Sequence, residues 1–171
     1  GPCCREVHIV AAGGECKELL IWMDREWDRE HSVHATELPA GYPLVESSTF
    51  SFLPSEEQAQ PFIRKDGDNT PRYLFEPGKA LMKAGAFNLI STRLEIAKLG
   101  RSTHYYVFDD PEKIKEVKES GKIYQIIRCE PLNKRSLKEA GKDFPKAEVT
   151  ARNIPMDTDT LRKKLGVTSG D

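Results

Sequence analysis

The sequence predicts an α+β fold, and three observations support this prediction. Short runs rich in β-branched residues follow one another near the N-terminus, as in an antiparallel sheet. Apolar residues at helical spacing come next, at Phe87, Ile90 and Leu94. The last third alternates extended runs with segments that begin at helix-capping residues. The chain has 171 residues, of which 38% are hydrophobic and 31% charged, so it can bury a core and form one large or two small domains.

Three strands are expected near the N-terminus, over residues 5–12, 16–23 and 31–38. Gly13-Gly14 is the turn between the first two strands. The second strand carries the run Leu-Leu-Ile-Trp-Met, so we expect it to be largely buried. Because the links between the strands are short, we expect an antiparallel meander.

Residues 39–71 have no regular pattern. Five prolines and two glycines in this region are typical of loops. Residues 46–53 are the exception, because Phe50 and Phe52 lie two positions apart and share one face of an expected strand.

A helical region is expected to open at Pro77, because a proline in the first helical turn lacks the N–H that would have no partner there. The helical spacing that begins at Phe87 continues through Ala97, and Gly100 is a natural residue to follow a helix end. A short strand is expected over residues 105–108.

The C-terminal region is expected to alternate strand, helix, strand and helix. The strands cover residues 122–129 and 146–151. Asn133 caps the first helix, which Gly141 ends, and Asp157 caps the second. A two-stranded sheet leaves its edges unpaired, so we expect either that the natural chain continues or that other strands of this chain complete the sheet.

Charge is unevenly distributed along the chain. Residues 121–171 contain 11 basic and 7 acidic residues, a net charge of +4, whereas residues 1–120 have a net charge of −5. The basic C-terminal third points to an anionic partner such as nucleic acid. The alternative is an ordinary solvated surface.

The pair Arg152-Asn153 is the strongest candidate for function. It lies between a predicted strand and the last helix, whose final turn holds the basic residues 162–164. Donors clustered in this way commonly contact phosphate. The structural alternative is that Arg152 pairs with Asp157 or Asp159 and that Asn153 adopts a positive φ.

A second distinctive segment runs from Tyr73 to Gly85. Lys79 and Lys83 are four residues apart and share one helix face. We favour a turn that leads into an amphipathic helix. The alternative is a surface patch in which Tyr73 and the two lysines contact RNA or an adjoining domain.

Other chemistries are not indicated by the sequence. His31 and His34 are three apart on a predicted strand, so they point to opposite faces and cannot share a metal without a bulge. The four cysteines form no C-x-x-C pair, which favours free thiols in a reducing cytoplasm. The glycine turn after the first strand lacks G-x-G-x-x-G. No apolar run approaches the ~20 residues needed to cross a bilayer.

Several separated motifs occur along the chain. They are Arg-Glu-Val-His-Ile-Val (5–10), Glu-Cys-Lys-Glu-Leu-Leu (15–20), Tyr-Leu-Phe-Glu-Pro (73–77) and Lys-Ala-Gly (83–85), followed by a strand, an Arg-Asn turn and an Asp-x-x-x-Leu-Arg-x-x-Leu helix over residues 147–165. In this order they resemble the C-terminal half of a bacterial family of class I S-adenosylmethionine-dependent methyltransferases. Residues 147–165 resemble its THUMP-like terminal domain, and the preceding part resembles its ferredoxin-like domain.

The resemblance implies a ferredoxin-like domain over residues 1–120 and a THUMP-like domain over residues 121–171 that is truncated at its C-terminus. It also implies a methyltransferase domain before Gly1, which binds S-adenosylmethionine and carries out catalysis. This chain itself is then expected to hold no catalytic residue, cofactor or metal.

The expected function is RNA recognition, with tRNA or rRNA as partner, as an accessory part of a cytoplasmic RNA methyltransferase. The alternative is a structural cap on the methyltransferase domain or a dimerisation module, which predicts an apolar patch on the ferredoxin-like part. The residues expected to contact RNA are Arg152, Asn153, Lys146, Lys163, Lys164, Lys134 and Arg135.

Overall fold

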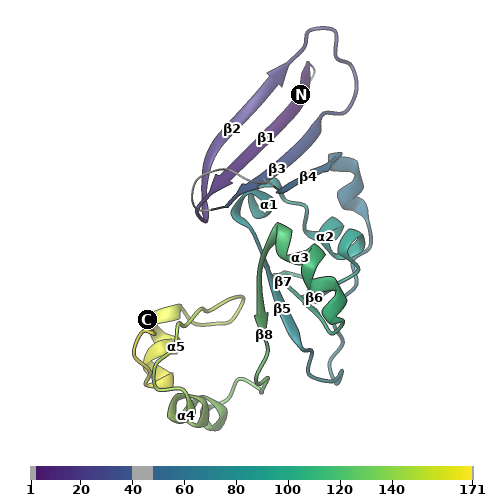
Figure 1. Cartoon of the computed structure of the whole chain (residues 1–171). Coiled ribbons are helices and arrows are strands. Elements are labelled where there is room, and N and C mark those ends of the chain that lie inside the picture. Colours follow the sequence, from purple (N-terminus) through teal and green to yellow (C-terminus); the bar gives the residue numbers. More distant parts are fainter. Residues whose placement is uncertain (1–2, 40–47, 171) are drawn as a thin grey trace. The chain divides into compact units, whose positions relative to one another are not determined.

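The computed structural model describes residues 3–39 and 48–170, which divide into two compact units (Figure 1). The first unit comprises Gly1–Ile126 and contains two four-stranded sheets. The second unit comprises Ile127–Asp171 and is built around two helices. The expected mixture of antiparallel strands and helices is confirmed.

The first sheet has the strand order β2-β1-β3-β4. Its strands are β1 (Cys4–Ala12), β2 (Glu15–Met23), β3 (Ser32–Leu38) and β4 (Ser48–Phe52). Strands β1 and β2 form the expected hairpin, and Gly13 and Gly14 both have the positive φ of its turn (58° and 79°). Strand β4 falls within the predicted strand 46–53, although residues 46 and 47 lie outside the described residues.

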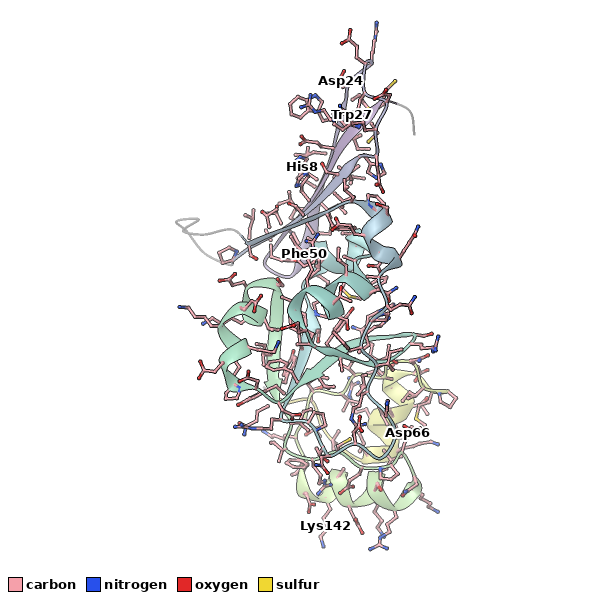
Figure 2. All side chains as sticks on the ribbon, turned by 90° about the vertical axis from the view of Figure 1, so that its right-hand side faces the viewer. His8, Asp24, Trp27, Phe50, Asp66 and Lys142 are labelled. Atoms are coloured by element: carbon pink, nitrogen blue, oxygen red, sulfur yellow. The ribbon has the colours of Figure 1, made fainter. Side chains whose placement is uncertain are left out.

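The expected meander is wrong, because β3 pairs with β1 in parallel rather than with β2. The link after β2 crosses the end of β1 and places β3 on its far side. Backbone hydrogen bonds hold this link against the start of β1, from Asp24 N–H to the Cys3 carbonyl (2.8 Å) and from Cys3 N–H to the Trp27 carbonyl (3.3 Å). Asp24 and Trp27 lie together at this end of the sheet (Figure 2). Strand β1 is therefore central and β2 lies at an edge.

The expectation that residues 16–23 are largely buried is also wrong. Every residue of β2 is exposed, and the five side chains from Leu19 to Met23 are each more than half exposed. The physical reason is the strand order, since β2 has β1 as its single sheet neighbour among the described strands.

One face of the first sheet contributes to the main core. Register pairs place Val33 and Ala35 of β3 beside Val7 and Ile9 of β1, and beside Phe52 and Phe50 of β4. Helix α1 (Lys79–Ala84) packs on this sheet through the buried Ala80 and Leu81. The core members from the first sheet are Ile9, Ala11, Val33, Ala35 and Phe52.

The second sheet is antiparallel throughout, with the order β6-β7-β5-β8. Its strands are β5 (Tyr73–Pro77), β6 (Ala97–Gly100), β7 (Thr103–Phe108) and β8 (Gly121–Gln125). Helix α2 (Phe87–Leu94), helix α3 (Ile114–Val117) and the 3₁₀ turns η1 (Pro54–Gln58), η2 (Pro111–Lys113) and η3 (Lys118–Ser120) complete the first unit. Phe75, Ile90 and Tyr106 are fully buried here.

Two helix boundaries in this region were predicted wrongly. Pro77 ends strand β5, and α1 begins at Lys79 after Gly78. Helix α2 ends at Leu94, because Glu95 takes a left-handed conformation (φ 52°) and the chain then enters β6. Gly100 therefore ends a strand and not a helix.

The second unit confirms both predicted caps. In helix α4 (Lys134–Asp143) the Asn133 side chain accepts a hydrogen bond from Ser136 N–H at 2.9 Å. In helix α5 (Thr158–Leu165) the Asp157 carboxylate accepts one from Thr160 N–H at 2.7 Å. These contacts are local, so the residue type at one position suffices to predict them.

The predicted strand 146–151 is wrong. A single parallel bridge joins Lys146 to Thr168, with Ala147 N–H donating to the Thr168 carbonyl and Thr168 N–H to the Pro145 carbonyl, both at 3.0 Å. Within residues 127–170 no strand ladder extends this bridge. Gly141 was expected to end α4, yet the helix continues to Asp143.

Candidate nucleic-acid interface

All seven residues predicted to contact RNA are exposed. Lys134 and Arg135 begin helix α4, and Lys163 and Lys164 lie in the last turn of α5. The other three lie on irregular segments, with Lys146 at the bridge to Thr168 and Arg152 and Asn153 before α5. The structure brings α4 and α5 into contact, and the Lys146 bridge attaches a third segment just after α5.

Four of these cations have no ion-pair partner in the part of the chain that the structure describes. Among residues 3–39 and 48–170, no carboxylate lies within 4.0 Å of the ammonium groups of the lysines at positions 134, 146, 163 and 164. Arg135 differs, since it pairs with Glu139 at 2.9 Å. Such lysines can contact an anionic ligand without first breaking an ion pair.

Lys163 and Lys164 also have a structural role at the end of α5. Cationic side chains in the last turn of a helix offset the negative end of its dipole. Gly166 closes the helix with a left-handed conformation (φ 69°), and its N–H donates to the Arg162 carbonyl at 2.9 Å. At the other end, the hydrogen bond from Thr160 N–H lowers the pKa of the Asp157 carboxyl. The helix is thus capped at both ends while its two lysines face solvent.

The loop before α5 takes the shape that the structural alternative predicted. Asn153 has a φ of 52°, a conformation that asparagine tolerates better than most residues. Ala151 N–H donates to the Thr158 hydroxyl at 3.2 Å, which attaches the loop to the first turn of α5. Asp159, one of the two expected partners of Arg152, pairs with Arg162 at 3.0 Å.

Arg128 holds the start of the second unit to the end of α4. Its guanidinium contacts Asp143 at 2.7 Å and Glu130 at 3.0 Å, and it lies over the Phe144 ring at 5.5 Å. The hydrogen bond to Asp143 raises the pKa of Arg128. This arginine is therefore a structural residue, in contrast to the lysines without partners.

A cluster that sequence reasoning missed lies on the first sheet. Glu6, His8 and His34 each place one potential metal-ligand atom within 4.8 Å of the other two (His8 is labelled in Figure 2). His8 and His34 are direct register partners of the parallel pair β1–β3. Periodicity along one strand cannot reveal them, because their proximity depends on which strands pair.

The residues of this cluster form a hydrogen-bond network. His8 bonds to the Glu6 carboxylate at 2.8 Å, and the two ring nitrogens of His34 contact the Ser32 and Ser51 hydroxyls at 2.9 and 2.7 Å. The two imidazoles stack at 4.5 Å with an angle of 17° between their planes. Stacked rings direct their nitrogen lone pairs side by side, so both must rotate before they can converge on one ion at the usual ~2.0–2.1 Å.

The structure also shows where the other segments considered in the sequence analysis lie. Gly13-Gly14 is a hairpin turn followed by a strand, so it cannot present a helix N-terminus to a nucleotide phosphate. Tyr73 is half-buried and packs on Phe108 at 5.1 Å. Lys79 and Lys83 are exposed on α1. No helix in the described part of the chain has the length and apolar character needed to cross a membrane.

Comparisons with known proteins identify two domain types. Residues 73–113 match the family model of a ferredoxin-like domain, and residues 121–171 match that of a THUMP domain-like family. The chain is thus an α+β protein with ferredoxin-like and THUMP-like domains. The first sheet, over residues 4–52, lies outside both matches.

A solved structure is similar over 99% of the chain, with 29% sequence identity and a TM-score of 0.83. It is described as a putative methyltransferase from Porphyromonas gingivalis. The present chain spans only 41% of that protein's length. No curated protein matches the chain.

Proposed function

We propose that this chain is the accessory, RNA-recognising part of an S-adenosylmethionine-dependent RNA methyltransferase. The methyl donor binds to a domain outside these 171 residues, and that domain transfers the methyl group. The observation that carries the proposal is the THUMP domain-like match over residues 121–171, the part of the chain with a net positive charge. The similarity to a methyltransferase that is more than twice as long supports the accessory role.

Phosphate contact is the mechanism we propose for RNA recognition. Arg152 anchors one phosphate, and Lys146, Lys163 and Lys164 supply further positive charge. The three lysines are exposed and have no ion partner in the described part of the chain, so binding displaces no internal ion pair there. Such contacts position RNA without reading its sequence, as suits a domain that delivers tRNA or rRNA to a separate active site.

Lys134, Arg135 and Asn153 extend the proposed surface. The two basic residues at the start of α4 add charge, although Arg135 must exchange its pair with Glu139 for a phosphate. Asn153 lies in the loop before α5 and has a left-handed backbone conformation. We place the protein in the cytoplasm, where tRNA and rRNA are modified.

The test is a titration of the chain with tRNA and with rRNA fragments at 50 and 200 mM salt. Four phosphate contacts to single-stranded RNA predict that affinity falls about 50-fold between these salt concentrations. The double variant Lys163→Ala/Lys164→Ala removes two of these contacts and is expected to reduce the magnitude of the slope of log K against log salt by about 1.4.

The matched control is Lys115→Ala in the first unit, which removes one exposed positive charge outside the proposed surface. We expect this variant to bind RNA as the unmodified chain does. The absence of RNA binding at 50 mM salt, or an equal effect of the control and the double variant, contradicts the proposal.

A further inference from the structure

Strand β2 carries apolar side chains on both of its faces. Successive residues of a strand point to opposite sides, so Leu19, Ile21 and Met23 lie on one face and Leu20 and Trp22 on the other. Their exposed fractions lie between 54% and 59%. The chain therefore leaves five consecutive large apolar residues in water.

This pattern is that of an inner strand. A strand with one buried face alternates apolar and polar residues, whereas a continuous apolar run is typical of a strand covered on both faces. Edge strands that face water are normally short or carry charges that prevent pairing. Strand β2 has nine residues, and its charged residues, Glu15, Lys17 and Glu18, are confined to the half near the hairpin turn.

Strand β2 also has a free edge. One edge of β2 pairs with β1, and its other edge has no strand partner among residues 3–39 and 48–170. The backbone groups on this edge are available to a further strand. An occupant must therefore supply a strand for the edge and apolar layers for both faces.

A second copy of this chain and an α/β domain differ in whether they meet this requirement. A second copy that pairs β2 with β2 extends the sheet in its own plane and adds no layer over Leu20 and Trp22. A domain with helices on both sides of a sheet supplies the strand and both layers together. The first sheet lies outside both matched family models, and the similar Porphyromonas gingivalis protein has more than half of its length outside the match.

We propose that β2 is an inner strand of a larger sheet, completed by an α/β domain elsewhere in the same polypeptide. In the isolated chain this sheet is interrupted at β2. Through register pairs with β1, Ile21 lies beside Val7 and Leu19 beside Ile9, so one apolar layer continues directly from the core of the first unit. The inference rests on the proposed function, because the completing domain is the one assigned to methyl transfer.

Hydrogen exchange provides the test. The 171-residue chain and the full-length product of its gene are compared by mass spectrometry of peptides that cover β2. We expect the β2 amides to exchange at least about 100-fold more slowly in the full-length protein, because both strand edges are then hydrogen-bonded. Equal exchange in the two proteins overturns the proposal, as does a gene product with no α/β domain beside these residues.

A substitution gives the second measurement. Leu20→Asp adds a charge to a half-exposed position, so the melting temperature of the 171-residue chain is expected to change by less than about 2 °C. The same change in the full-length protein buries that charge and is expected to lower the melting temperature by more than about 5 °C. The matched control, Lys17→Asp on the charged half of β2, is expected to have little effect in either protein.

Two outcomes distinguish this inference from its alternatives. A concentration-dependent dimer of the 171-residue chain, with the β2 amides protected from exchange, assigns the edge to a second copy and overturns the proposal. Protection of β2 in a full-length protein that fails to bind RNA supports the sheet continuation and contradicts only the RNA role.

Discussion

The carboxylate of Glu37, on strand β3, accepts a hydrogen bond from the backbone N–H of Ala80 at 2.8 Å. It also accepts one from Leu81 N–H at 3.3 Å. Glu37 thus caps helix α1 from a strand 43 residues earlier in the chain. Glu57 does the same for helix α2, with hydrogen bonds from Asn88 N–H (2.7 Å) and Leu89 N–H (3.0 Å).

The first prediction concerns the coupling between Glu37 and Gly78. A methyl group at Gly78 would lie 2.2 Å from the Glu37 carboxylate oxygen, so Gly78→Ala must displace the cap. We expect Gly78→Ala and Glu37→Ala each to cost about 1 kcal/mol in the free energy of unfolding. The double variant is expected to cost little more than either single variant, because both remove the same interaction. Urea denaturation of the four proteins measures this cycle.

Glu57→Ala serves as the control for this cycle. It removes a similar cap from a different helix, so its cost is expected to add to that of Gly78→Ala. Additive costs for Glu37→Ala and Gly78→Ala would show that the two residues do not interact.

The second prediction concerns Gly141 in the second unit. This glycine is buried in α4, and a methyl group there would lie 1.7 Å from the backbone oxygen of Leu165 in α5. Backbone cannot move aside as a flexible side chain can, so Gly141→Ala is expected to cost about 3 kcal/mol and to separate the two helices. Amide chemical shifts of residues 127–170 should change widely, with those of the first unit preserved.

Gly170→Ala is the matched control in the same unit. A methyl group at Gly170 meets Glu148 N at 3.4 Å, an ordinary contact, so this variant is expected to fold normally. A stable Gly141→Ala variant with an unchanged spectrum would mean that α4 and α5 do not pack through this glycine.

Sequence predicts best the features that depend on near neighbours. The Asn133 and Asp157 caps are contained within four residues of chain, and the glycine hairpin is contained within the turn itself. The Glu37 cap escapes prediction, because nothing near residue 37 specifies a helix 43 positions later. Gly141 was given the commonest role of a helical glycine, while its actual role depends on how α4 meets α5.

The candidate sites also differ in whether they depend on near neighbours or on which strands pair. The exposed basic residues of the second unit can be listed from charge alone, since solvated lysines need no partner to be placed at the surface. The proximity of His8 and His34 depends on the parallel pairing of β1 and β3, whereas the short links predicted an antiparallel meander. The exposure of β2 depends on the same strand order.

The third prediction concerns Glu95, which ends α2 in a left-handed conformation with a φ of 52°. This conformation strains any residue with a Cβ atom by about 1–2 kcal/mol. Glycine at this position removes the backbone strain. It also removes the exposed ion pair with Lys113 (3.3 Å) and increases the conformational entropy of the unfolded chain, and both of these changes reduce stability. We expect Glu95→Gly to be about 1 kcal/mol more stable than Glu95→Ala, which loses the pair and keeps the strain. Thermal denaturation checks this order, and the reverse order contradicts it.

The fourth prediction concerns the pH dependence that His34 gives to stability. Burial lowers the pKa of His34, and the nearby His8 adds to this effect, whereas Glu6 opposes it. The unfolded chain, with a histidine pKa of about 6.5, therefore binds a proton at this position before the folded chain does. Stability from neutral His34 is fully present above that pH and is lost as the pH falls below it.

The measurement is the free energy of unfolding from urea titrations at pH 8, 7 and 5.5. Between pH 7 and 5.5 the unmodified chain is expected to lose more stability than His34→Gln, which cannot take up the proton. Between pH 8 and 7 the two proteins should differ by a constant amount, because His34 is then largely neutral in both states. Parallel losses over the lower interval would mean that the stacked His8–His34 pair accommodates the charge without cost to the fold.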